Sequence, residues 1–502
     1  MRKFLTKLKK LSPLRSVLLG AAILLPIGAI AAQLFQSEPE AVEPPDLKAY
    51  LEEKAVVVPD EQTLISNGAC PGYYYDAFTE LKEQGMVLRA EKKYAAAAAK
   101  FEEAFGLCRA PEVKIALNNA AIGKQLAYVL VVSVPTGGNN PNSANNAVEM
   151  LRGAAQAQEK INSDPELWPG PDADKRPLKL LLVDDRDQPE VAEQLAEILT
   201  DDDAYESVLG VVGHWTSDVS LAAAKVYNRS RSLVFMTPIS TANNVTRRGS
   251  WAFRSTLHNS SGACALARYM LRSRRLDKAA VFYVDGVTYS TEIREEFEYV
   301  IDQQGGEIVA AFDMSDPNFR ARAKVREVKR KGAEAILLAT DNASVDKAWS
   351  VMREAEQAGG LTVLGDLANL YTPRTFEQAG DAAIGMVMAT AWDFDGSADL
   401  TFKEDAIALW KGEVSAATAT TYSAVIAMAE AMQGGATRLA IQSRLSDDDF
   451  ASLNGAFQGP LTFEDRNLEA PVQLVQVVKL RGADEGTGTM DFTPILSESS
   501  CK

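Results

Sequence analysis

The sequence predicts an α/β protein with two lobes, each built around a largely parallel β-sheet. From residue 128 onward, short apolar runs of strand length alternate with amphipathic helical segments, which is the pattern of a parallel α/β structure. This region is too long for one doubly wound sheet, so we divide it into two lobes near Leu257. The 502-residue chain also leaves room for further segments before the lobes.

The predicted strands are short and continuously apolar, which is typical of strands covered on both faces. They are residues 128–134, 178–183, 208–212, 233–236, 279–284, 308–312, 335–339, 362–364 and 384–389. The predicted helices between them include residues 188–199, 290–303, 319–331 and 344–358.

Residues 1–35 have the composition of an export signal peptide or a membrane anchor. Six Lys and Arg residues within residues 1–15 precede an apolar run at 16–32. The run is near the lower limit of about 17 residues for a membrane span. Ala29-Ile30-Ala31 resembles a cleavage site and favours a signal peptide, whereas the long basic leader favours an uncleaved transmembrane helix. Both alternatives place the rest of the chain in the periplasm or elsewhere outside the cytoplasm, and an uncleaved helix anchors it to the inner membrane.

The composition also bounds the partners. The net charge of −16 argues against binding to nucleic acid. Residues 36–69 are rich in Pro and Glu and are expected to form a linker. The last segment, 483–502, is expected to be a flexible tail.

Residues 70–125 are predicted to form a small all-α segment. Helices are expected near 76–91 and 94–107, with Gly85 allowing close approach and with Tyr94 and Phe101 between the helices. This pattern resembles one tetratricopeptide repeat, short of the three or so that a free-standing solenoid needs. The segment is either an interaction module or, as we favour, a part that packs against the following domain.

The cysteine and histidine positions predict no metal site and no cofactor. Cys70 and Cys108 bracket the helical hairpin, and in an oxidising compartment they are expected to form a disulfide, with two buried thiols as the alternative. Cys264 lies in a predicted helix and is expected to be a core residue. No CxxC occurs, and His214 and His258 stand alone, as structural histidines usually do.

Two successive predicted strands end in hydroxyl-rich turns. The strand at 208–212 is followed by Thr216 and Ser217, and the strand at 233–236 by residues 237–241. Ligands of open parallel sheets bind beyond the carboxyl ends of the strands. A helix N-terminus at such a place offers unpaired N–H groups that suit a carboxylate. The alternative is that these hydroxyls only cap helices.

A series of motifs carries a family resemblance across residues 128–480. In chain order they occupy residues 131–138 with 150–154, then 183–185, 213–217, 237–242, 254–256, 284–290, 379–386 and 459–465. Their types and order resemble the type I periplasmic solute-binding proteins of ABC importers, the leucine/isoleucine/valine-binding branch in particular. No single motif is specific to this family, but the order of the motifs over this length of chain is.

The resemblance implies a domain at 126–482 whose two lobes are joined by three crossing strands and close on a ligand by hinge motion. The first lobe would comprise residues 126–258 and 389–456. The second would comprise 259–388 and 457–482.

The resemblance also implies a set of ligand-binding residues. Ser217 and Thr216 would meet the ligand's α-carboxylate, and Tyr289 would close over the ligand from the second lobe. In the second turn, next to Ser240, the Ile239 carbonyl and the Thr241 hydroxyl would meet the α-ammonium. Trp215 either walls the side-chain pocket or packs in the core.

The sequence departs from the family at two places. Gly365-Asp366-Leu367 replaces a Gly-x-Glu turn, so Asp366 either pairs with a ligand ammonium or only caps the following segment. Polar residues at 340–342 replace an aromatic residue. These differences argue against a branched-chain amino acid and leave a polar or acidic amino acid, or another carboxylate, as the ligand.

Two functions are compatible with these features. The first is a receptor that captures a small solute, an amino acid or related carboxylate, and delivers it to an ABC permease. The second is a membrane-anchored sensor or adaptor that signals through a membrane partner without transport. An enzyme is not predicted, because the chain has no nucleophile elbow, metal constellation or phosphate-binding glycine loop.

Overall fold

The computed structural model describes residues 74–136, 141–164, 167, 176–201, 205, 207–247, 249–366, 369–397, 399–432, 435–457, 459–480 and 490–495. The chain divides into two units, Met1–Pro44 and Pro45–Lys502, and these residues all lie in the second unit. The predicted signal or anchor at 1–35, the linker at 36–69 and Cys70 lie outside the described residues. None of the described helices combines the length and the hydropathy of a membrane span.

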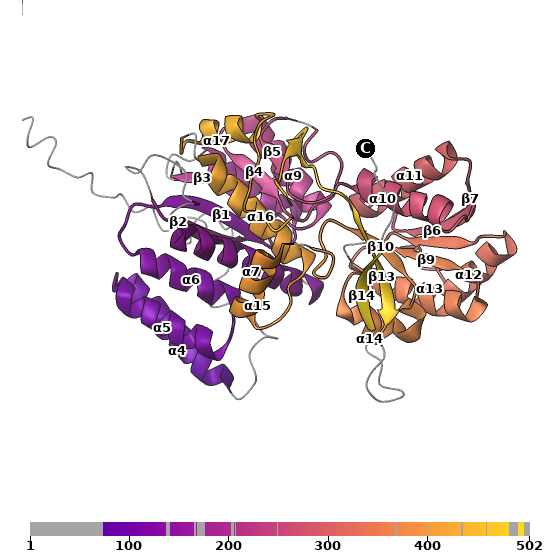
Figure 1. Cartoon of the computed structure of the whole chain (residues 1–502), viewed down its shortest axis with the longest axis horizontal. Coiled ribbons are helices and arrows are strands. Elements are labelled where there is room, and N and C mark those ends of the chain that lie inside the picture. Colours follow the sequence, from indigo (N-terminus) through magenta and orange to yellow (C-terminus); the bar gives the residue numbers. More distant parts are fainter. Residues whose placement is uncertain are drawn as a thin grey trace, which may run out of the picture. The chain divides into compact units, whose positions relative to one another are not determined.

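Two seven-stranded sheets form the framework of the described chain (Figure 1). The first has the order β11 (Phe463–Glu464), β12 (Asn467–Leu468), β5 (Ala252–Arg254), β4 (Val234–Thr237), β3 (Val208–Val212), β1 (Tyr128–Val134) and β2 (Leu178–Asp184). The second has the order β14 (Met490–Ile495), β13 (Gln473–Lys479), β10 (Val387–Thr390), β9 (Thr362–Gly365), β8 (Ala335–Leu338), β6 (Lys278–Tyr283) and β7 (Glu307–Asp313). β1 to β5 pair in parallel, and so do β6 to β10, whereas β13 and β14 add to the second sheet antiparallel.

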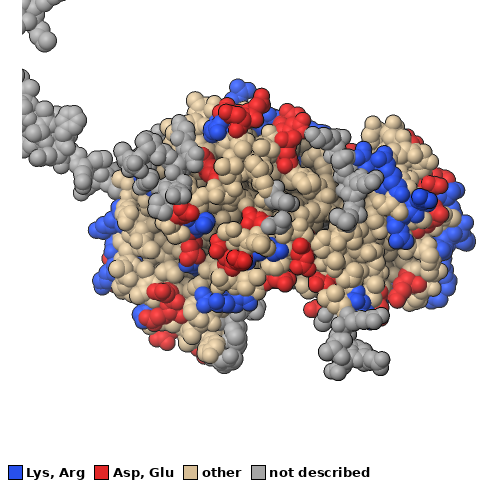
Figure 2. Space-filling view, viewed as in Figure 1, with Lys and Arg blue, Asp and Glu red and all other residues tan. Residues whose placement is uncertain are grey.

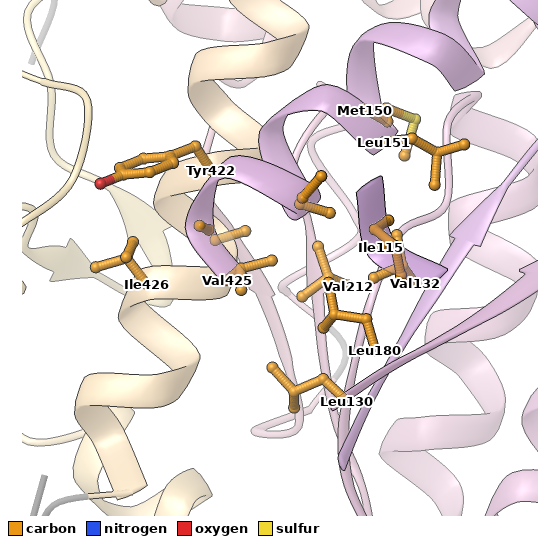
Figure 3. Packing of buried hydrophobic residues seen from close by; sticks show 14 of the residues in the cluster. Ile115, Leu130, Val132, Met150, Leu151, Leu180, Val212, Tyr422, Val425 and Ile426 are labelled. Atoms are coloured by element: carbon orange, nitrogen blue, oxygen red, sulfur yellow. The ribbon is translucent and has the colours of Figure 1, made fainter. Parts of the chain in front are cut away.

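The first sheet and the helices on its two faces make up the first lobe. On one face lie α4 (Tyr75–Ala90), α5 (Tyr94–Leu107), α6 (Pro111–Ile122), α7 (Pro141–Ser163), α15 (Leu400–Trp410), α16 (Ala416–Ala431) and α17 (Arg438–Leu445). On the other lie α8 (Pro189–Asp201) and α9 (Ser217–Ser230). Strand β1 is apolar throughout because both of its faces are buried. Leu130 and Val132 pack in the hydrophobic cluster under the first set of helices (Figure 3), whereas Val129 and Val131 pack in the cluster under α8 and α9.

The second lobe has the same two-sided arrangement. One face of its sheet is covered by α12 (Ala321–Arg330), α13 (Val345–Ala358), α14 (Pro373–Ala379) and the 3₁₀ turn Gly380–Ala383. The other is covered by α10 (Asn259–Arg268), the π-helical turn Tyr269–Ser273 and α11 (Thr288–Gln303). On β6, Ala280 and Phe282 face the first set and Ala279 and Val281 the second, so this strand is also buried on both faces.

The N-terminal helices α4 to α6 are part of the first lobe. Phe101 of α5 and Ile115 of α6 are fully buried in the same hydrophobic cluster as Leu130 of β1. A buried ion pair, with Lys82 Nζ 3.3 Å from Glu112 Oε1, joins α4 to α6. The prediction that this segment packs against the following domain is confirmed, whereas its tetratricopeptide character is not shown.

Some predicted boundaries differ from the structure. Residues 457–482 were assigned to the second lobe, but β11 and β12 join the first sheet, where Asn467 pairs with Arg254 and the ring of Phe463 packs on that of Phe253. In the described chain, the third crossover therefore follows at 469–472, after those at 255–258 and 391–399. The expected flexible tail contains β14, which pairs along its length with β13.

The cysteines give a mixed result. Cys108 is buried at the end of α5, and because Cys70 lies outside the described residues, their disulfide stays a prediction. Cys264 in α10 is half-buried and disulfide-bonded, which differs from the expectation of a simple core residue.

The contact between α4 and α5 yields a first test. A Cβ added at Gly85 would lie 2.6 Å from Cε1 of the fully buried Phe101 ring, so the ring or the helix would have to shift. We expect Gly85→Ala to lower the free energy of unfolding by about 1–3 kcal/mol, as for other overpacked cores. Chemical denaturation measures this change.

Gly106→Ala in α5 is the matched control. A Cβ at Gly106 meets no atom within 4 Å, so its higher helix propensity should stabilise the protein by up to about 1 kcal/mol. Equal stabilisation by both substitutions would show that the two helices do not approach closely at Gly85.

Candidate functional site

A cavity of about 350 Å³ lies where the carboxyl ends of strands from both sheets meet. Its lining residues follow β2, β3 and β4 in the first lobe, and in the second they follow β8 and β9 or lie at the start of α11. They are Asp187, Pro189, Trp215, Thr216, Ser217, Asp218, Val219, Ile239, Ser240, Thr241, Val287, Tyr289, Asp341, Asn342, Ala343 and Asn369. This is the location expected for a ligand of open α/β sheets.

The turn between β3 and α9 forms one wall. Trp215 is 5% exposed and belongs to the core cluster of the first lobe while also lining the cavity, so both alternatives for it apply. Thr216 occupies the N-cap position of α9 but makes no side-chain capping bond, because its Oγ1 donates to Asp187 Oδ1 at 2.5 Å. The first turn of α9, which starts at the buried Ser217, therefore has no side-chain cap from Thr216.

The turn after β4 brings Ile239, Ser240 and Thr241 to the cavity, as predicted. Ser240 and Thr241 are each 2% exposed, and their hydroxyls have no hydrogen-bond partner among the described residues. A buried polar group without a partner costs roughly 1–3 kcal/mol, and such groups are rare in native proteins. At a cavity wall they mark the place where a ligand's polar atoms would bind.

Arg254 holds this turn in place from β5. Its buried guanidinium donates from Nη1 to the Thr241 carbonyl at 3.3 Å and from Nη2 to the Ala242 carbonyl. Burial lowers the pKa of Arg254 to about 9, so the group stays charged at neutral pH. The turn is therefore fixed by its carbonyls, and these bonds leave the hydroxyl of Thr241 unused.

The second lobe contributes Tyr289, as predicted, but its predicted acid lies behind the wall. Tyr289 lines the cavity, and its hydroxyl donates to Asp366 Oδ1 at 3.2 Å. Asp366 is 1% exposed and is not among the described lining residues. Its carboxylate accepts from the backbone N–H groups of Thr340 at 3.0 Å and Asn369 at 2.8 Å. This placement matches the capping alternative for Asp366.

Three acidic lining residues were not identified from the sequence: Asp187, Asp218 and Asp341. Asp187 follows β2 and Asp341 follows β8, so the rule that ligands bind at strand ends applied to them as well. Asp187 has a positive φ of 55°, a conformation that Asp and Asn tolerate better than most residues. Burial, with smaller effects from Asp185 and Asp218, raises its pKa to about 6, although the bond from Thr216 opposes the shift.

Both histidines have structural environments, as expected. His214 is buried, and its Nδ1 lies 2.7 Å from Asp185 Oδ2, which also accepts from Ser133 Oγ at 2.9 Å. His258 accepts from the Ser261 N–H at the start of α10. In the part of the chain that the structure describes, no group of His, Cys, Asp and Glu could hold a metal ion.

Comparisons with known proteins agree with this geometry. A model of the periplasmic binding protein family matches residues 133–485. No match was found among curated proteins. A leucine-binding protein LivK from Thermotoga maritima is 20% identical, with a TM-score of 0.59 over 73% of this chain and 98% of that chain.

Two further solved structures have different ligands. The LivJ protein from Streptococcus pneumoniae in complex with isoleucine is 18% identical, with a TM-score of 0.57 over 74% of this chain and 100% of that one. A solute-binding protein from Rhodopseudomonas palustris in complex with 3,4-dihydroxybenzoic acid is 15% identical, with a TM-score of 0.58 over 73% of this chain and 96% of that chain. At these identities the similarity shows the fold and leaves the ligand open.

The environment of Asp366 predicts a loss of stability on substitution. Both carboxylate oxygens accept hydrogen bonds, so the amide of Asp366→Asn would turn its NH₂ group toward donors in either orientation. We expect the free energy of unfolding to fall by about 1–3 kcal/mol. Asp381→Asn is the control, because its exposed ion pair with Lys479 is worth no more than about 1 kcal/mol. Equal unfolding midpoints for the two variants would contradict this assignment.

The raised pKa of Asp187 predicts a pH-dependent difference in stability. Its folded pKa of about 6 lies above the ordinary 3.8, so its contribution to stability is complete below pH 4 and is lost as the pH rises through 6. The Asn side chain of Asp187→Asn does not titrate, so this variant does not lose stability as the pH rises. Its free energy of unfolding should therefore increase relative to that of the wild type over this pH range, by less than about 3 kcal/mol because the carboxylate is only partly buried. Urea unfolding at pH 3.5 and pH 7 measures it. A difference independent of pH would be inconsistent with the shifted pKa.

Proposed function

The chain belongs to the periplasmic binding protein family, and from this premise we propose that it is an extracytoplasmic receptor for a small carboxylate solute. The solute is an amino acid or a related acid, which the receptor holds between its two lobes and delivers to an ABC-type importer. Proteins of this family bind solutes and are not enzymes.

The observation that carries this proposal is the pair of buried hydroxyls of Ser240 and Thr241. Ser240 and Thr241 line the cavity, their hydroxyls have no partner among the described residues, and residues at the N-terminus of α9 line the same cavity. A carboxylate supplies acceptors for hydroxyl groups, and it is also the ligand that a helix N-terminus favours. The solutes named for the relatives, isoleucine and 3,4-dihydroxybenzoic acid, share this group.

Contacts between the lobes support a receptor that closes around its ligand. The backbone N–H of Asn243, beyond β4, donates to Glu292 Oε2 of α11 at 2.8 Å. Next to the cavity, the Thr288 hydroxyl donates to the carboxylate of Asp218. With the three crossovers, these few polar contacts form the kind of hinged joint that ligand binding closes in two-lobed proteins.

The Thr241 hydroxyl provides the test of this function. We expect Thr241→Val, which keeps the shape of the side chain, to weaken binding of a carboxylate solute by about tenfold to a hundredfold, the cost of a lost hydrogen bond to a charged group. Isothermal titration calorimetry should use a ligand identified by thermal shift from a panel of amino acids and aromatic acids.

Thr421→Val is the matched control. Thr421 of α16 is also fully buried and its hydroxyl also has no partner among the described residues, but it does not line the cavity. Both variants should fold equally well, and only Thr241→Val should lose affinity. Equal affinities in the two variants would remove the hydroxyl turn from the binding site.

A further inference from the structure

The cavity wall carries an unbalanced negative charge. Asp187 and Asp218 of the first lobe and Asp341 of the second line it, and the described lining residues include no Lys, Arg or His. The donors that bond these carboxylates are uncharged: the hydroxyls of Thr216 and Thr288 and, for Asp341, the N–H of Ser344 at 2.8 Å.

The charge of the cavity wall is more one-sided than that of the chain. The chain has 52 Lys and Arg against 68 Asp and Glu, whereas the described lining residues hold three acids and no base. Figure 2 shows both signs on the viewed face, with blue basic side chains gathered at its right-hand edge. The carboxylates are also contributed by both lobes, so closure brings like charges together in a shrinking, poorly solvated space.

Independently, the hydroxyls of the lining residues Ser240 and Thr241 have no partner among the described residues, which favours a polar ligand. We assign them, together with the α9 N-terminus, to one carboxylate of the ligand, in place of the α-ammonium that the family resemblance gave to the Thr241 hydroxyl. An α-ammonium then balances that carboxylate, which leaves a zwitterion with no net charge to offset the aspartates. A purely aliphatic side chain would bring no further positive charge to Asp187 and Asp341, which line the cavity from different lobes.

We propose that the solute is an α-amino acid with a positively charged side chain, an ammonium or a guanidinium, which bridges Asp187 of the first lobe and Asp341 of the second. The inference rests on the proposed receptor function. A cation placed there removes the repulsion that opposes closure, so the same contact provides selectivity and favours the closed state. Because burial raises the pKa of Asp187 only to about 6, its carboxylate is mostly ionised at neutral pH and available to the cation.

The test compares ligands that differ in one charge. Calorimetry at pH 7.5 and low salt should measure lysine and arginine against norleucine, which has the carbon chain of lysine without the terminal ammonium, and against glutamate and 3,4-dihydroxybenzoate. We expect lysine or arginine to bind at least about tenfold more tightly than norleucine, with an affinity that falls as salt is added.

Variants then locate the cation. Asp187→Asn and Asp341→Asn should each weaken the cationic ligand by about tenfold to a hundredfold and weaken norleucine much less, because Asn retains the neutral hydrogen bonds and tolerates the positive φ of Asp187. Asp346→Asn is the control: it removes the same charge from the first turn of α13, where Asp346 is exposed and does not line the cavity.

The outcomes separate this inference from the function on which it rests. Norleucine, glutamate or the aromatic acid binding as tightly as lysine and arginine would overturn the cationic ligand and leave the carboxylate receptor in place. Cationic ligands that lose no more affinity in Asp187→Asn and Asp341→Asn than in Asp346→Asn would also overturn it. No binding of any of these five carboxylates would instead overturn the proposed function.

Discussion

The buried carboxylate of Asp185 ties together the strand ends on which the cavity is built. Its Oδ2 accepts from Ser133 Oγ of β1 at 2.9 Å and lies 2.7 Å from His214 Nδ1 in the turn after β3, while its Oδ1 accepts the Asp187 N–H at 3.0 Å. With Asp185 fully buried, each of these bonds is shielded from water and is costly to break. The network sets the ends of β1, β2 and β3 relative to one another, and with them Trp215, the residue after His214.

At this edge of the sheet, the hydrogen bonds of each side chain at the cavity determine which groups of its neighbours stay free. The backbone of Asp187 is held at a positive φ, and its carboxylate takes the Thr216 hydroxyl that would otherwise cap α9. The N-terminus of α9 therefore has no side-chain cap from Thr216. Arg254 fixes the neighbouring turn by its carbonyls and leaves the buried Thr241 hydroxyl without a partner among the described residues. Preorganisation of this kind lowers the cost of ordering the site when a solute binds.

The two lobes play different parts in this arrangement. The first supplies most of the wall and is reinforced by α4 to α6, whose side chains extend its core on the side away from α8 and α9. The second supplies Tyr289 and Asp341, and its own buried acid, Asp366, is used to hold Tyr289 and the chain after β9. The cavity is therefore lined by both lobes, and mostly by the first.

The sequence by itself determined the class of fold, the extents of β1 and β3, and the two hydroxyl-rich turns. Burial on both faces of a strand and the capping of a helix depend on residues that are neighbours in the chain, so a local pattern predicts them. Periodicity could not place β12 beside β5, since this pairing joins residues far apart in the chain. The strand β14 was not predicted either, although it pairs with the nearby β13. Periodicity also could not distinguish the role of Asp366 from that of Asp341. Both acids follow predicted strands, and only the folded chain decides which one is surrounded by donors and which one faces the cavity. Tertiary packing sets the partners of a buried side chain, and it therefore also decides which charged residues line the cavity.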